Sequence, residues 1–138
     1  MKMIKLTLLA LLMTLATAVD AKQVKAPHVY MFGFSGSFTD SLIYLTDIQD
    51  VQQVWFDTKT KFLLGRDNYS YQLKNYLSEN LQQPNRVCVV FFAKSKKKAE
   101  KMYVKLRKKY LNNPKASYDI RYISEQEFKF EPIDISEE

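Results

Sequence analysis

Residues 33–41 read GFSGSFTDS and place three serines, two glycines and an aspartate between two apolar runs. The segment comes close to the G-x-S-x-G turn that presents a serine nucleophile, but its second glycine stands one position early. The only histidine, His28, lies seven residues from Ser35 in the same predicted strand, roughly 23 Å away at about 3.3 Å per residue. We therefore expect no serine triad. We interpret the segment as a hairpin turn whose serines and Asp40 bond to the backbone of the turn.

Cys88 is the only cysteine, so the chain cannot form an internal disulfide. It stands in the apolar run 86–93, where a free cysteine is usually a small buried hydrophobic side chain. Because burial raises the pKa of a thiol, we expect Cys88 to be inert rather than a nucleophile.

Carboxylates are the remaining candidates for catalysis. One histidine and one cysteine cannot assemble the usual nitrogen and sulfur ligands of a metal site. The aspartates also lack the spacing of a calcium loop, so we expect no metal and no cofactor. A small hydrolase that uses carboxylates in the 40–67 region stays an alternative to a protein without catalysis, since two carboxylates can hydrolyse a glycosidic bond. The aspartates concerned are Asp40, Asp47, Asp50 and Asp57.

The segment 94–115 has the strongest charge bias of the chain, with ten basic residues against Glu100 alone. Such a face can bind anionic polymers without sequence preference. Two other interpretations stay open: ordinary solvation of a helix surface, and pairing with the acidic residues that follow position 124. The predicted anion-binding residues are Lys96, Lys97, Lys98, Lys101, Lys105 and Arg66.

Arg66 precedes a predicted helix, and two interpretations apply to it. Its guanidinium and the first helical amides could converge on a small anion. Alternatively, Asp67 or Asn68 caps the helix and the segment has only a structural role, which is the more usual arrangement.

Hydrophobic periodicity predicts a small α/β (α+β) domain. Strands are predicted over 28–35, 41–48, 86–93 and 118–123, and helices over 67–81 and 94–111, whereas 50–65 has mixed signals. The order β-β-α-β-α-β implies a sheet of about four strands packed by two helices. The last two strands would form a right-handed crossover if they were parallel neighbours. We assign 22–135 to this single domain and 136–138 to a disordered acidic tail.

The first 21 residues have the basic, apolar and small-residue order of a secretory signal peptide, with a cut predicted after Ala21. The apolar run 6–18 is shorter than the roughly 20 residues of a membrane-spanning helix, and no later run competes with it. We therefore expect a periplasmic or secreted protein without a transmembrane segment after cleavage.

Three stretches carry a resemblance over most of the chain: HVYMFGFSGSFTDSLIYLTDIQ, FDTKTKFLLGRDNYSYQL and YDIRYISEQEF. They resemble a group of short exported proteins with signal peptides from Bacteroides- and Prevotella-type bacteria, for which no activity is assigned. The resemblance implies export from a Gram-negative cell and carries no catalytic residues. Because the residues themselves offer no distinctive catalytic chemistry, we predict a non-catalytic binding domain. An anionic glycan or a lipid head group is then the accessible partner, and nucleic acid is disfavoured.

Overall fold

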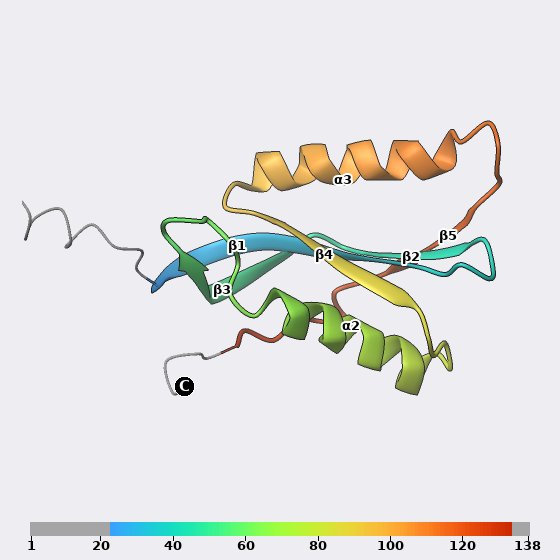
Figure 1. Cartoon of the computed structure of the whole chain (residues 1–138). Coiled ribbons are helices and arrows are strands. Elements are labelled where there is room, and N and C mark those ends of the chain that lie inside the picture. Colours follow the sequence, from blue (N-terminus) through green and yellow to red (C-terminus); the bar gives the residue numbers. More distant parts are fainter. Residues whose placement is uncertain (1–22, 134–138) are drawn as a thin grey trace, which may run out of the picture.

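The computed structural model describes residues 23–133 (Figure 1). The predicted signal peptide over 1–21 and the predicted tail over 136–138 lie outside the described residues. Between 23 and 133, no helix has the length and apolar character needed to cross a membrane. The elements are β1 (Gln23–Gly36), β2 (Leu42–Thr46), β3 (Gln49–Asp57), α2 (Arg66–Asn80), β4 (Val87–Ala93), α3 (Lys96–Leu111) and β5 (Asp119–Ile123).

The centre of the sheet is β1, which pairs antiparallel with β2, β3 and β4. Met31 pairs with both Gln49 and Phe92, so β3 and β4 lie along opposite edges of β1. β2 shares the edge of β3, but its register differs by one residue, which is the signature of a bulge between the two strands. β2 and β3 therefore form one long bulged arm of a hairpin with β1.

The mixed α+β class is confirmed, with a sheet of five strands and two helices among the described residues. The prediction of about four strands missed β3, which occupies part of the segment with mixed signals. β5 pairs parallel with β2, so it points the same way as β4. However, β1 and β2 lie between β4 and β5, and the two strands around α3 are not the neighbours that a simple crossover unit requires.

The two helices cover opposite faces of the sheet, with α3 above it and α2 below it in Figure 1. Successive side chains of β1 point to opposite faces and therefore toward different helices. The ring of Phe32 meets Tyr103 of α3 at 5.3 Å, whereas a Cβ on Gly33 would meet Leu73 of α2. The main core cluster lies on the α2 face, where Tyr69, Leu73 and Leu77 are fully buried at the predicted spacing of four.

Aromatic contacts hold α3 against the other face. Phe32, which stacks on Phe91 of β4 at 5.2 Å, meets Tyr103 of α3, and Tyr110 of α3 contacts Phe34 at 5.0 Å. Ser95 caps the helix by accepting the backbone N–H of Lys98, which is why the helix begins at Lys96 rather than at the predicted residue 94. Because these aromatic residues face the sheet, the lysines of α3 face the solvent.

The segment after β5 runs along the α2 face and is held by two glutamine side chains. Gln49 accepts the N–H of Phe130 and donates to the carbonyl of Phe128, both at 2.8 Å. Gln72 bonds in the same two-point manner to the backbone of Glu131, at 2.9 Å for each contact. The segment thus becomes part of the core on the side of the sheet away from α3.

Candidate functional site

The exposed side of α3 carries a row of lysines at helical spacing. This lysine row is defined as Lys97, Lys101, Lys105 and Lys108, which line an open surface depression of about 530 Å³ together with Glu100 and Val104. The predicted residues Lys97, Lys101 and Lys105 therefore lie together on one surface. Lys96 and Lys98 are exposed in the first turn, next to this row rather than in it.

The first turn of α3 holds Lys96, Lys97 and Lys98 and no acidic residue. The amino end of a helix has a partial positive charge, so cations at this position are unfavourable and an anion there is favourable. Lys108 and Lys109 in the last turn have the charge that helix stability favours, whereas the three lysines of the first turn create an unfavourable interaction. A bound polyanion would relieve it.

The acidic residues at 125–131 do not neutralise this surface. Glu127 bonds to Ser124, and the backbone of Glu131 is held by Gln72, both away from α3. The ion pairs found between 23 and 133 are His28–Asp50, Asp40–Arg86 and Asp119–Arg121, and none involves a lysine of α3. The acids at 134, 137 and 138 lie outside the described residues. The acids at 125–131 therefore do not support the interpretation that acidic residues after position 124 pair with the lysines of α3.

Arg66 does not join the lysines. Its guanidinium donates to the carbonyl of Val90 at 3.0 Å and lies 5.5 Å from the ring centroid of Phe92, whereas the lysine row lies on the far side of the sheet. The capping prediction for Asp67 or Asn68 is wrong, because the helix begins one residue earlier and Gly65 is its N-cap, with no side-chain cap bond. Gly65 has φ 72°, a left-handed conformation that favours glycine.

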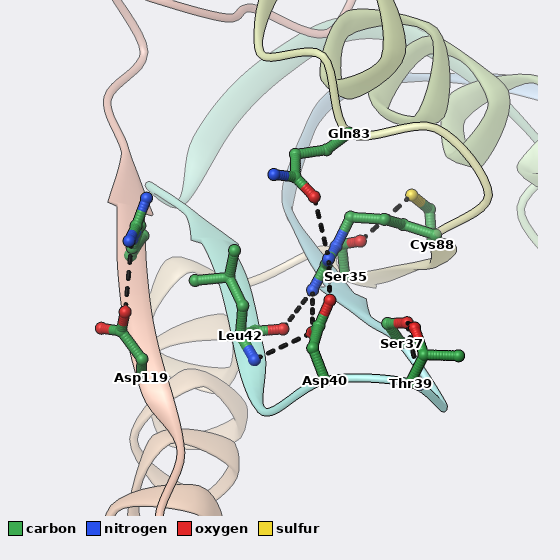
Figure 2. A network of polar contacts seen from close by, with 10 residues as sticks. Ser35, Ser37, Thr39, Asp40, Leu42, Gln83, Cys88 and Asp119 are labelled. Carbon is green, nitrogen blue, oxygen red and sulfur yellow. Dashed lines mark hydrogen bonds and ion pairs between the residues drawn. The ribbon is translucent and has the colours of Figure 1, made fainter.

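The turn at 37–41 is confirmed as the connection between β1 and β2, and a buried arginine holds it in place (Figure 2). Arg86 donates to the two carboxylate oxygens of Asp40 at 3.2 and 3.3 Å, and also to the carbonyl of Leu42. Asp40 accepts the N–H of Leu42, and Ser37 accepts the N–H of Thr39, as the turn prediction proposed. Sequence reasoning missed the role of Arg86, whose signal was a charged residue at the start of an apolar strand.

Ser35 contacts Cys88, which is half-buried rather than fully buried as its apolar neighbours predict. Ser35 is fully buried, and the Cys88 thiol donates to its hydroxyl at 3.6 Å. Burial raises the pKa of Cys88, and the hydrogen bond to Ser35 opposes this shift only in part. At neutral pH the thiol is therefore protonated, a poor nucleophile.

The aspartates considered for hydrolysis each have a structural partner. Asp47 accepts the N–H of Glu125 at 3.2 Å, and Asp57 accepts the N–H of Lys59 at 2.9 Å within a turn. Asp50 pairs with His28 at 2.9 Å, the one place where the structure brings the histidine and a carboxylate together. Between residues 23 and 133, no group of three His, Cys, Asp or Glu side chains is placed to hold a metal ion.

The lysine row is consequently the surface with the most coherent chemistry. It is a line of exposed cations on a helix whose opposite side is fixed to the sheet. Comparison of the chain with protein-family models, with curated proteins and with solved structures finds no match.

Proposed function

We propose that this protein is an exported, non-catalytic binding domain that holds an anionic polysaccharide along the outer side of α3. The observation that carries the proposal is the lysine row, which has four exposed cations and no ion pair among the described residues. Successive positions of the row are three or four residues apart, so the cations follow the helix axis. An extended polymer with regularly spaced negative charges fits such a line.

A polysaccharide suits this surface better than a lipid bilayer does. A helix that lies in a membrane interface buries a wide apolar face between the lipid head groups. In α3 the aromatic residues Tyr103 and Tyr110 contact the sheet instead, and Val104 is the one apolar side chain that lines the depression beside the row. Export follows from the order of residues 1–21 and would place the protein in the periplasm or outside the cell, with limited access to nucleic acid.

Heparin is the probe that tests the proposal. The dissociation constant should rise steeply with NaCl concentration, because binding releases counterions from the polymer. The double variant Lys101→Gln/Lys105→Gln should bind at least tenfold more weakly, since each lysine near an anionic surface contributes about 1 kcal/mol. The slope of log Kd against log salt should also fall by about one for each lysine that contacts the polymer.

A matched control variant has the same net charge as Lys101→Gln/Lys105→Gln. Lys74→Gln/Lys129→Gln removes two exposed lysines from α2 and from the segment after β5, on the other side of the sheet. This control should retain the affinity and salt slope of the parent protein. Equal weakening by both double variants would show that only the net charge matters, and a flat salt response would reject the proposal. Stronger binding to anionic vesicles than to heparin would assign the surface to lipid head groups instead.

A further inference from the structure

A second surface feature is independent of the lysine row. A pocket of about 290 Å³ opens at the end of the sheet where the turn at 37–41 meets the end of α3 and the start of β5. Figure 1 shows these segments together at one end of the molecule. The residues that give it its chemical character are Phe34, Ser37, Phe38, Asp40, Tyr110 and Tyr118.

Aromatic rings dominate this pocket. Tyr110 contacts Phe34 at 5.0 Å and meets Tyr118 edge to face at 5.1 Å, so the wall is a connected aromatic cluster. Phe38, at the tip of the turn, is 96% exposed. A phenylalanine that leaves nearly all of its surface in water contributes nothing to the core, and beside a pocket it is suited to stack against a ligand.

The turn that presents Phe38 is held rigidly. Asp40 is bonded to Arg86 and to the N–H of Leu42, and the Ser37 and Thr39 hydroxyls bond at 2.9 Å (Figure 2). A loop fixed in this way loses little conformational entropy when a ligand binds. The exposed ring therefore belongs to a preorganised surface.

The charges around the pocket favour an uncharged ligand. Asp40 is the one lining residue with a formal charge, and its pairing with Arg86 cancels most of its attraction for a cation and most of its repulsion of an anion. The Lys109 ammonium, 5.8 Å from the Tyr110 ring centroid, is not part of the lining, so the lining offers no unpaired charge to a charged ligand. The remaining polar groups are hydroxyls and carboxylate oxygens, which donate to or accept from neutral hydroxyl groups.

We propose that this pocket binds one pyranose ring of a neutral saccharide. The apolar C–H face of the sugar stacks on Phe38 and the tyrosine pair, and its hydroxyl groups bond to Asp40 and Ser37. Aromatic walls with a few placed polar groups are the usual form of a small-ligand site, and this volume lies near the lower end of the range for such sites. The pocket and the lysine row are separate surfaces, so this inference does not depend on heparin binding.

The test is an NMR titration of the full mature chain with methyl β-D-glucopyranoside and with N-acetyl-D-glucosamine. Amide signals of the turn at 37–41 and of Val87, Tyr110 and Tyr118 should shift in a saturable way at millimolar sugar. Phe38→Ala should weaken binding about tenfold, and Phe38→Tyr should keep it because the ring remains. Both substitutions change an exposed side chain, so the fold is expected to persist.

Phe62→Ala is the matched control, since Phe62 is 68% exposed in the loop after β3 and does not line the pocket. It should leave the sugar affinity unchanged. Two further probes separate the ligand classes: cyclohexanol, an apolar ring with one hydroxyl, and choline, a cation. If neither sugar shifts these amides, or if cyclohexanol or choline binds as tightly as the sugars, the saccharide assignment is overturned.

Discussion

Arg86 and Asp40 are 46 positions apart in the sequence, yet their side chains pair through contacts of 3.2 and 3.3 Å. The side chain of Arg86 is 2% exposed and that of Asp40 is 43% exposed, so the pair joins the interior to the surface turn. Arg86 also lies 5.2 Å from the ring centroid of Tyr44. One buried guanidinium thereby connects the β1–β2 turn to the start of β4.

Arg86→Ala should destabilise the protein strongly. The substitution leaves the carbonyl of Leu42 and the side chain of Gln83 without a donor and opens a cavity, so we expect a loss of about 3 kcal/mol in the free energy of unfolding. Urea denaturation measures it. Arg121→Ala is the control, because Arg121 and Asp119 form a pair that is more than half exposed and should contribute no more than about 1 kcal/mol. Equal losses for the two variants would contradict this role of Arg86.

The pairing of Asp40 with Arg86 should also make the stability of the protein depend on pH. The hydrogen bonds from Arg86 and from the N–H of Leu42 lower the pKa of Asp40. A carboxyl whose pKa is lower in the folded state stabilises the fold above its unfolded pKa, and this contribution disappears as the pH falls through the folded value. Unfolding free energies measured below about pH 4 should therefore fall less steeply for Asp40→Asn than for the parent. Parallel curves for the two proteins would show that Asp40 has no shifted pKa.

The local sequence pattern was sufficient to predict much of the fold. Tyr69, Leu73 and Leu77 repeat every four residues, which indicates α2 without knowledge of its neighbours. β3 was missed because two consecutive polar residues, Gln52 and Gln53, interrupt its apolar pattern, and Gln53 has a φ of 59°. What stabilises β3 is its pairing with β1, a long-range interaction that no local window contains.

The same limit applies to the candidate site. The exposed lysines of α3 were predictable, because helical periodicity separates them from the aromatic side. Arg66 is predicted to bind an anion because it precedes a helix N-terminus, and only the topology shows that α2 and α3 cover opposite faces of the sheet. The position of the segment after β5 depends on Gln49 and Phe130, which are 81 residues apart, and their interaction has no signature in the sequence.

Gly33→Ala should destabilise the packing of α2 on the sheet. A Cβ at this position would lie 2.5 Å from Cδ2 of Leu73 and 3.2 Å from the ring of Phe130, and both side chains are buried. Such overpacking costs about 1–3 kcal/mol, measurable by urea denaturation. Gly36→Ala is the matched control, since its Cβ would meet only the Phe34 ring, at 3.6 Å, and should change stability by less than about 0.5 kcal/mol.

A double variant tests the cause of that loss. If the clash with Leu73 is responsible, Gly33→Ala should cost less in a Leu73→Ala background, where the side chain that it meets is shortened. Additive costs in the double variant would place the strain elsewhere.

Cys88 should react slowly with a disulfide reagent in the folded protein. Because burial raises its pKa, little thiolate is present at pH 7.5, and thiolate is the reactive form. Labelling with 5,5′-dithiobis(2-nitrobenzoate), followed by absorbance, should be slow in buffer and fast in denaturing urea. Rapid labelling of the folded protein would instead identify Cys88 as an activated thiol.

Gln49→Leu should release the segment after β5. The substitution replaces the amide side chain by an apolar one of similar size and removes both amide contacts, which leaves the carbonyl of Phe128 and the N–H of Phe130 without these partners in the core. Two buried unsatisfied groups cost about 3 kcal/mol together. Hydrogen exchange at the Phe130 amide should therefore accelerate more than exchange in α3, because α3 packs on the other face of the sheet.

The control for Gln49 lies in the same strand. Gln52 is exposed, so Gln52→Leu should alter stability by less than about 0.5 kcal/mol and leave exchange at Phe130 unchanged. If Gln49→Leu accelerated exchange equally throughout the protein, the segment would unfold only with the whole domain. Exchange confined to 128–133 would show instead that the glutamine contacts hold this segment as a separate unit, which can open while the sheet stays intact.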